Sequence, residues 1–484
     1  MKPHGIRSLF ANLSGSAAEG RIRRPAVAGA FYPQDPVALR TMVDGYLGEA
    51  AAAGGPAGSV LGLIAPHAGF IYSGGVAAHA YAALRGQGIE RVVVLAPSHL
   101  ESFSYASVYA GDGYATPLGV IPVDTAARAL LTSSGSLIRV SGRGHEWSGD
   151  RGEHSLEVQL PFLQRVLGEF RLLPVVLGAA DYSLCRALGR ALAPLARDEK
   201  TLLVASSDLS HYHPYAEAQR RDAETLAAVQ ACDYLTLPRH EACGAGPITA
   251  LLIAAEAAGV RQARVLRYAN SGDTGGGRDS VVGYGAVVLP RAGPASEAAP
   301  PPLTAEERQA LLRLARRSVE AAVRGAPEPS LDSAAALSQY AGVFVTLTCL
   351  GELRGCVGRI LPELPLAEAV REMAGSAACR DNRFPPVREE ELPLLTVEIS
   401  VLSRLRRVEK ADEVEIGRHG LLVRQGRRHG ILLPQVAQEH GLGREEFLQA
   451  CCRKAGLDPE AWRDPETDLF VFTADVFGSR ARPV

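Results

Sequence analysis

The sequence has no excess of either charge. Its 51 lysine and arginine residues stand against 53 aspartate and glutamate residues, which gives a formal net charge of -2. The basic residues form short clusters, such as the RIRR of residues 21–24, and no extended basic stripe. Because proteins that hold nucleic acid by its phosphates need clustered lysine and arginine, the composition predicts that nucleic acid is not a partner.

The sequence also indicates no disulfide framework, and we expect neither a signal peptide nor a membrane span. Its eight cysteines are scattered over 484 residues, so we expect reduced thiols and a cytoplasmic location. Residues 1–20 contain no continuous apolar core of the kind that a signal peptide needs. Residues 50–84 carry no charged side chain, but glycine, proline and histidine interrupt them. We interpret this stretch as buried strand, loop and helix, and we expect no membrane partner.

The length and one break in composition predict two domains. A chain of 484 residues is too long for one hydrophobic core. Residues 292–302 are rich in proline, alanine and serine and have no apolar period, which is typical of a linker. Thr304 stands three residues before Glu307, a capping box that predicts the start of a helix. We therefore expect domains at 20–291 and 303–484, and the absence of an internal repeat indicates unrelated folds.

The first domain has the pattern of an α/β fold. Short apolar runs that suit buried strands alternate with alanine-rich helical stretches, and the runs are residues 59–64, 91–96, 171–178 and 201–206. In open α/β sheets, ligands bind beyond the carboxyl ends of the strands. The residues that follow these runs are therefore the place to look for a site.

Three of these strand ends carry histidine. His67 follows the first run, His99 the second, and Asp208, His211 and His213 follow the fourth. A single histidine after a strand is commonly a hydrogen-bonded loop residue. Three such ends together are better explained by a shared metal or acid/base site than by chance.

Cys243 is a candidate third ligand. It lies just before a segment in which Pro247 suits the first turn of a helix, and the positive end of a helix dipole favours the thiolate that binds metal. The alternative is a small buried cysteine that only fills space. Two imidazoles and a thiolate would leave open positions on iron, copper or zinc, as a catalytic site requires.

Proton-transfer groups are also present in the sequence. Asp208 and His211 are three residues apart, so His211 is a candidate general acid or base that Asp208 orients. Glu153 and His154 stand at the predicted start of an amphipathic helix that contains Leu156, Leu160, Leu163 and Leu167. They either cap that helix or face the same cleft.

Six ordered motifs resemble the Memo family, whose fold is that of class III extradiol dioxygenases. They are RRPAVAGAFYP, PHAGFIYSG, PSH, EHSLEVQLPFL, SSDLSHYH and ACG, between residues 23 and about 290. The resemblance implies that His67, His99 and Cys243 bind metal and that Asp208 and His211 complete the cleft. It also implies Fe(II), with copper or zinc as alternatives. A thiolate in place of the carboxylate of extradiol dioxygenases alters metal preference and redox potential.

The sequence of the second half predicts strands, a proline-rich loop and helices. Cys356 lies between two glycines near Arg354, where the thiol is either reactive or simply small enough for a tight strand crossing, which we favour. In the loop, Arg380, Asp381 and Arg383 form either an anion-binding cluster or an ion-pair cluster that pins the loop. These five residues are a candidate second site.

The motifs ELRGCVG, RDNRFPP, VEISVLS and GILLPQVA resemble the AMMECR family over roughly residues 303–484, which implies an α+β domain. The resemblance also implies membership of the three-part AmmeMemoRadiSam system, in which AMMECR, Memo and a radical SAM protein are associated. The chain has no Cys-x3-Cys-x2-Cys motif for an iron–sulfur cluster, so the radical SAM protein would be a separate partner.

These observations leave two functions open. The first is a metal-dependent redox or oxygenase-like enzyme, because a carrier has no need of a proton-transfer pair such as Asp208 and His211. The second is a non-catalytic metal-binding or interaction scaffold.

Overall fold

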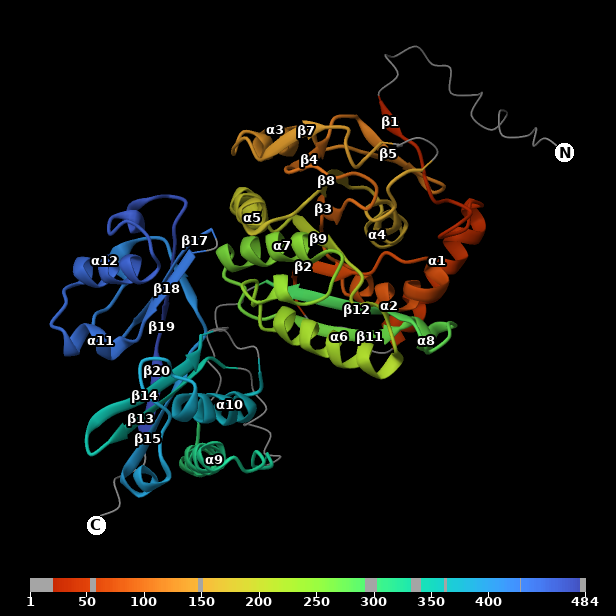
Figure 1. The fold of residues 1–484 in the computed structure, drawn as a ribbon. Helices are drawn as coiled ribbons and strands as arrows, with labels where there is room; N and C mark the ends of the chain where they lie inside the picture. Colours follow the sequence, from red (N-terminus) through yellow and green to blue (C-terminus); the bar gives the residue numbers. More distant parts are fainter. Residues whose placement is uncertain are drawn as a thin grey trace. The chain divides into compact units, whose positions relative to one another are not determined.

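The computed structural model describes residues 21–52, 58–146, 151–291, 303–331, 341–360, 364–426 and 428–478. The chain divides into two compact units, Met1–Glu297 and Ala298–Val484 (Figure 1). The predicted linker, residues 292–302, lies outside the described residues. Within the described ranges, none of the helices combines the length and the apolar character that crossing a lipid bilayer requires.

A nine-stranded sheet runs through the first unit (Figure 1). Its strands lie in the order β10 (His211–His213), β12 (Val281–Pro290), β2 (Val60–Ala65), β9 (Thr201–Ser206), β3 (Arg91–Pro97), β8 (Arg171–Leu177), β4 (Ala106–Tyr109) and β7 (Ile138–Ser141), and β11 (Arg264–Asn270) pairs with β12. The four strands that the apolar runs predicted are β2, β9, β3 and β8, which are adjacent and parallel. Their carboxyl ends therefore meet along one edge of the sheet.

Helices cover both faces of this sheet, as expected for an α/β fold. Helices α1 (Pro36–Ala52), α2 (Phe70–Ala82) and α4 (Leu160–Leu167) share one buried core with alternate residues of β3 and β9. On the opposite face, a Cβ added at Gly62 of β2 would lie 2.9 Å from the side chain of Leu251, so α7 (Ala245–Ala257) packs directly against that strand. The unit therefore has three layers.

The remaining elements of this unit are shorter or lie outside the main sheet. They are a sheet of β1 (Ile22–Arg23), β5 (Gly113–Thr116) and β6 (Gly119–Pro122), the helices α3 (Thr125–Thr132), α5 (Tyr182–Arg197), α6 (Tyr215–Gln230) and α8 (Ser271–Thr274), and the 3₁₀ segments η1 (Glu157–Gln159) and η2 (Leu237–Arg239).

The second unit is an α+β fold with two four-stranded sheets. One has the order β14 (Glu352–Arg359), β13 (Val343–Cys349), β15 (Leu395–Leu402) and β20 (Ala474–Gly478), and its core includes α9 (Ala305–Arg324) and α10 (Leu366–Cys379). The other has the order β16 (Arg406–Val408), β19 (Asp468–Phe472), β17 (Gly420–Gln425) and β18 (Arg428–Leu432), and it packs with α11 (Pro434–Glu439) and α12 (Arg444–Lys454). Short 3₁₀ segments are η4 (Glu389–Leu394), η5 (Ala411–Glu413) and η6 (Ala461–Arg463).

The first helix of this unit begins where the capping box predicted. The Thr304 side chain accepts from the backbone N–H of Glu307 at 3.2 Å, and the Glu307 carboxylate accepts from the backbone N–H of Thr304 at 2.7 Å. The helix ends at Gly325, whose φ of 64° is a left-handed conformation that glycine adopts without strain. Local sequence therefore determines both ends of α9.

The helix predicted to begin at Glu153 begins later. Residues 157–159 form the 3₁₀ segment η1, and α4 starts at Leu160. The backbone N–H groups of His154 and Ser155 donate to the Glu153 carboxylate. Since these bonds satisfy Glu153 in an irregular turn, the helical period extends only from Leu160 onward.

Candidate metal centre

Three residues from separate parts of the chain meet at the carboxyl edge of the main sheet. His67 follows β2, His99 follows β3, and Cys243 lies two residues before α7. One ligand atom from each lies within 4.8 Å of the others, and His67 Nε2 is 3.2 Å from Cys243 Sγ. The structure therefore brings together the three metal ligands that the sequence suggested.

The hydrogen bonds of His67 determine which ring nitrogen is free. The Ser206 hydroxyl donates to the backbone carbonyl of Ser155 at 2.6 Å, so its oxygen accepts from His67 Nδ1 at 2.8 Å. The Gln159 amide also donates to that oxygen, at 2.7 Å. Because Nδ1 carries the proton, the lone pair of His67 Nε2 points toward Cys243. This is the tautomer that a metal-binding histidine needs.

Glu153 likewise determines which ring nitrogen of His99 is free. Its carboxylate lies 3.0 Å from His99 Nδ1 and accepts from the backbone N–H of His99 at 2.5 Å. The Glu153 side chain is 2% exposed, so this bond is shielded from water. An acceptor on Nδ1 leaves Nε2 of His99 available as a ligand. Glu153 therefore faces the cleft, one of the two alternatives that the sequence left open.

His154 also belongs to this cluster. Its ring lies 4.8 Å from that of His99 in a nearly parallel stack, 5.4 Å from that of His67 and 4.9 Å from that of Phe31. His99, Glu153 and His154 form a second group with suitable spacing for a metal. The Glu153 carboxylate already accepts several hydrogen bonds in this group, so we interpret it as a network that orients His99.

Burial sets the charge of His67, whereas Glu153 sets that of His99. Burial, followed by the imidazoles of His154, His99 and His211, holds the pKa of His67 well below its usual range. His67 is therefore neutral, as metal binding requires. Burial lowers the pKa of His99, but the hydrogen bond and the charge of Glu153 outweigh it and leave that pKa raised.

The pKa of the Cys243 thiol differs from the expectation. The sequence predicted that the helix dipole of α7 lowers its pKa, whereas burial, with the nearby Asp208 carboxylate, raises the pKa to about 12. Desolvation of a thiolate exceeds the effect of a helix end that begins two residues away. The free site therefore holds a protonated thiol, and binding a metal there releases a proton.

Asp208 and His211 both lie near the cluster but are not paired with each other. Asp208 accepts from the backbone N–H of His67 at 2.8 Å, and burial raises its pKa to about 7. Among the described residues, no hydrogen bond or ion pair joins Asp208 to His211. The geometry therefore does not favour the prediction that Asp208 orients His211. The Asp208 carboxylate instead fixes the loop that carries His67.

The segment after Asp208 is bent at Tyr212. Tyr212 has a φ of 63°, a left-handed conformation that is costly for a bulky residue, and the register of β10 shifts between His211 and His213. His211 and His213 consequently have different surroundings. His213 Nε2 lies 2.7 Å from the Glu241 carboxylate, whereas His211 is close enough to depress the pKa of His67.

Two residues that orient the ligands were not identified from the sequence. Ser206 is the last residue of a predicted strand, and Gln159 lies inside the motif EHSLEVQLPFL. Both side chains are fully buried and polar, and Gln159 also donates to the backbone carbonyl of Pro66 at 3.0 Å. The position of Gln159 among apolar residues of a predicted helix could have indicated this role, because a buried amide needs hydrogen-bond partners.

The candidate second site in the other unit consists of ion pairs that hold a loop. Asp381 accepts from the backbone N–H of Cys356 at 2.8 Å and pairs with Arg383 at 2.7 Å. Arg354 pairs with Glu391 at 2.7 Å and donates to the carbonyls of Pro385 and Pro386. Arg380, at the end of α10, is exposed. These contacts fix residues 381–391 along β14 and favour a structural role.

We expect iodoacetamide to label Cys356 no faster than Cys349, within about threefold, because reactivity follows the thiolate fraction. The guanidinium of Arg383 is bound to Asp381, and the Thr346 hydroxyl lies 3.3 Å from Cys356 Sγ. Peptide mapping after short exposures at neutral pH measures both rates in one sample. Selective labelling of Cys356, roughly tenfold faster than Cys349, would contradict a structural role.

The fold and the cluster together define the class of this protein. A mostly parallel sheet places two imidazoles and a buried thiol at its carboxyl edge, so the first unit is an α/β domain with a candidate metal site. The family model described as Memo-like protein matches residues 23–288, and the AMMECR1 model matches residues 312–477. The chain belongs to the Memo family and carries an AMMECR1 domain in its second half.

Two relatives with high sequence identity agree with this assignment. A MEMO1 family protein of Methanopyrus kandleri is 37% identical over 287 residues, covering 56% of this chain and 99% of the relative. One of Methanosarcina barkeri is 39% identical over 282 residues, covering 55% of this chain and 100% of the relative. The solved structure of an uncharacterized protein from Pyrococcus horikoshii is 39% identical over 36% of this chain and 95% of that chain, with a TM-score of 0.34.

Proposed function

We propose that the Memo unit is a metal-dependent redox protein of the dioxygenase-like type, with Fe(II) as its metal. The observation that carries this proposal is the protonation pattern of His67 and His99. Both Nδ1 atoms have protein acceptors, so both Nε2 atoms are available beside Cys243 Sγ. Such an arrangement has no evident use in a purely structural histidine pair.

The donor set fits a metal of the iron, copper or zinc type. Imidazole suits all three, and one thiolate adds a soft ligand. Three protein ligands leave positions open to other molecules, which is typical of catalytic sites and not of closed structural ones. His67, His99 and Cys243 would hold the ion, which would supply Lewis acidity and, as iron, one-electron chemistry.

The residues around the ligands suit proton transfer. Asp208 has a pKa of about 7 and is 4% exposed, so both of its protonation states are accessible near neutral pH. His211 is half-buried near His67 and provides a second titratable group. Asp208 would exchange a proton at its carboxylate and His211 at its imidazole, each independently.

Oxygen uptake by the iron-loaded protein, with ascorbate as reductant, tests this function. We expect uptake above that of the same concentration of free iron, and a loss of this excess in Asp208→Asn and His211→Ala while iron stays bound. Protein that retains none of iron, copper or zinc under reducing conditions would refute the metal function.

A non-catalytic metal-binding or interaction scaffold is the alternative. It is favoured by the protonated, buried thiol of Cys243, which would hold a metal firmly once deprotonated. The same assay distinguishes the two functions. A scaffold would bind iron with no oxygen uptake beyond that of free iron, and its behaviour would be unchanged in the Asp208 and His211 variants.

A radical SAM protein is the partner that we propose for either function. The proposal rests on the association of Memo and AMMECR domains with such a protein in one system. Co-purification of a tagged radical SAM protein with this chain, compared with each of its two units alone, tests the proposal. If the tagged radical SAM protein recovers neither the whole chain nor either unit, the proposed partnership is wrong.

The role of Glu153 gives a further prediction. Glu153→Gln should weaken metal binding by about 10–100-fold, because removing the carboxylate that orients a ligating histidine has effects of this size. Glu241→Gln is the matched control, since Glu241 also holds a histidine, His213, that is not one of the three proposed ligands. Competition with a chromophoric chelator measures both affinities. Equal affinities would show that His99 does not need this orientation.

A further inference from the structure

Asp222 is a buried carboxylate that the proposed function does not use. It lies on α6, which packs against β10, β11 and β12 (Figure 1), and it is fully buried. In the described part of the chain, its hydrogen bonds come from neutral groups and no cation pairs with it. Burial raises its pKa. Because a buried carboxylate without a cation costs stability, we looked for a task that its charge performs.

Two neutral donors hold the Asp222 carboxylate. Oδ1 accepts from the backbone N–H of Ser210 at 2.8 Å, and Oδ2 accepts from the Tyr268 hydroxyl at 2.8 Å. These bonds oppose the effect of burial on the pKa and favour the ionised form. A negative charge is therefore fixed beside the backbone that leads to His211.

The segment before His211 is also tied to β12. The backbone N–H of Leu209 donates to the Gly283 carbonyl at 2.8 Å, and the backbone N–H of Gly283 donates to the Ser210 carbonyl at 2.9 Å. A Cβ added at Gly283 would lie 2.0 Å from Oδ2 of Asp222, so only glycine allows the carboxylate to approach this closely. Asp222 and β12 together fix the backbone that carries His211.

One peptide group joins Asp222 to His211. The N–H of Ser210, which donates to Asp222, and the carbonyl of Leu209 belong to the same planar peptide unit. That carbonyl accepts a hydrogen bond from the His211 ring. Hydrogen bonds in a chain polarise one another, so a carboxylate at the N–H makes the carbonyl a stronger acceptor. The bond to Leu209 fixes one ring nitrogen of His211 as a donor and leaves the other free.

The charges around His211 act in both directions. Burial lowers the pKa of His211, and the imidazole of His99 lowers it further. His67 is also close enough for His211 to depress its pKa. Asp222 and Glu241 both raise the pKa of His211. The Glu241 side chain is 45% exposed, so water screens its charge more than that of Asp222.

We propose that Asp222 is the positioning residue of His211 and that it orients the imidazole through the Leu209–Ser210 peptide, so that one defined ring nitrogen exchanges the proton. This inference rests on the proposed function, in which His211 transfers a proton. The sequence suggested Asp208 for this task, whereas the structure provides a carboxylate from the helix that follows. Asp222 acts only through His211.

A titration of His211 tests this link without any metal. The whole protein carries isotope-labelled histidine, and the His211 signals are identified by their absence in His211→Ala. We expect the pKa of His211 to be lower in Asp222→Asn than in the wild type, because the variant loses the negative charge and keeps the shape of the side chain. An unchanged pKa would overturn the proposal.

The wild-type protein gives a second measurement that needs no substitution of Asp222. Nitrogen chemical shifts show which ring nitrogen of neutral His211 carries the proton. We expect a single tautomer, because the Leu209 carbonyl accepts from one nitrogen only. An equal mixture of the two tautomers would also overturn the proposal.

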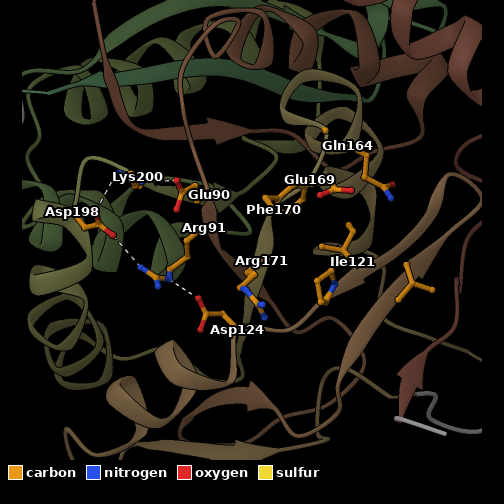
Figure 2. Close-up of a pocket in the computed structure, with 13 residues that line it drawn as sticks. Glu90, Arg91, Ile121, Asp124, Gln164, Glu169, Phe170, Arg171, Asp198 and Lys200 are labelled. Atoms are coloured by element: carbon orange, nitrogen blue, oxygen red, sulfur yellow. Dashed lines mark hydrogen bonds and ion pairs between the residues drawn. The ribbon is translucent and has the colours of Figure 1, made fainter. Parts of the chain in front are cut away.

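Asp124→Asn is the matched control. Asp124 is 3% exposed and likewise accepts from one backbone N–H, that of Ala127 at 2.9 Å, and from one side chain, that of Arg91 at 2.7 Å. It lines a cavity at the opposite edge of the main sheet, where Arg91 begins β3 (Figure 2). The pKa of His211 should be unchanged in this variant. A fall equal to that in Asp222→Asn would show that the loss of any buried carboxylate has this effect, and the proposal would be wrong.

Oxygen uptake by the iron-loaded protein gives a functional readout. A positioned acid or base contributes about 10²–10⁴-fold, so Asp222→Asn should keep its iron and lower the excess uptake by about tenfold or more. One limb of the pH profile should move to lower pH, in the same direction as the pKa of His211. Reduced uptake with an unchanged pH profile would indicate a merely structural role. If the iron-loaded wild type shows no uptake above that of free iron, the proposed function fails, and the titration still decides whether Asp222 positions His211.

Discussion

His67→Ala and Cys243→Ser should each lose most of the bound metal, with affinity for Fe(II) lowered by about 100-fold or more. The loss of a ligand removes one bond and also the geometry of the other two, so the effect should exceed that of an orienting residue. Elemental analysis after anaerobic loading and desalting measures the occupancy directly. The same samples, loaded with copper or zinc, give the preference of the site.

The controls for these variants are chosen to match the residue type. His213→Ala removes a neighbouring histidine that pairs with Glu241, and Cys185→Ser removes a thiol that is buried on α5. Both should keep the metal. Asp208→Asn and His211→Ala should also keep most of it, because we assign these residues to proton transfer. Equal occupancy in the His67 and His213 variants would refute the assignment of the ligands.

Glu157→Gln should destabilise the Memo unit by about 3–5 kcal/mol, the usual result of leaving one partner of a buried ion pair unpaired. Glu157 is fully buried, pairs with the buried Arg23 and accepts from the Tyr32 hydroxyl at 2.5 Å. It also accepts from the backbone N–H groups of Ala26 and Val27. The variant therefore removes the negative charge that binds Arg23 and the segment from Ala26 to Tyr32.

Urea unfolding followed by circular dichroism measures this loss in the transition of the first unit. The matched control is Glu146→Gln, since Glu146 pairs with Arg21 at the surface, where the two side chains are 39% and 60% exposed. We expect that change to cost at most about 1 kcal/mol because water screens the pair. Similar midpoints for the two variants would show that burial of the Arg23–Glu157 pair contributes little. Arg23 also donates to the Glu153 carbonyl, so its role extends to the residue that orients His99.

The sequence by itself determined the four central strands of the main sheet and the start of α9. Apolar runs of strand length gave β2, β3, β8 and β9 because these strands are buried on both faces and need no alternation. The capping box at Thr304 gave the start of α9 because both partners lie within one helical turn. The candidate ligands His67, His99 and Cys243 followed from strand ends, from a helix start and from the resemblance to the Memo family.

Only the tertiary structure decided how these residues act. The tautomers of His67 and His99 depend on Ser206 and Glu153, which are 139 and 54 residues away along the chain. The pKa of Cys243 depends on burial, which no local pattern gives, and the helix dipole alone predicted the wrong direction. Asp208 and His211 are neighbours in sequence, yet the bend at Tyr212 and the bond to the His67 backbone separate their roles. Long-range packing determines desolvation and hydrogen-bond partners, and these in turn set the charge of each group in the site.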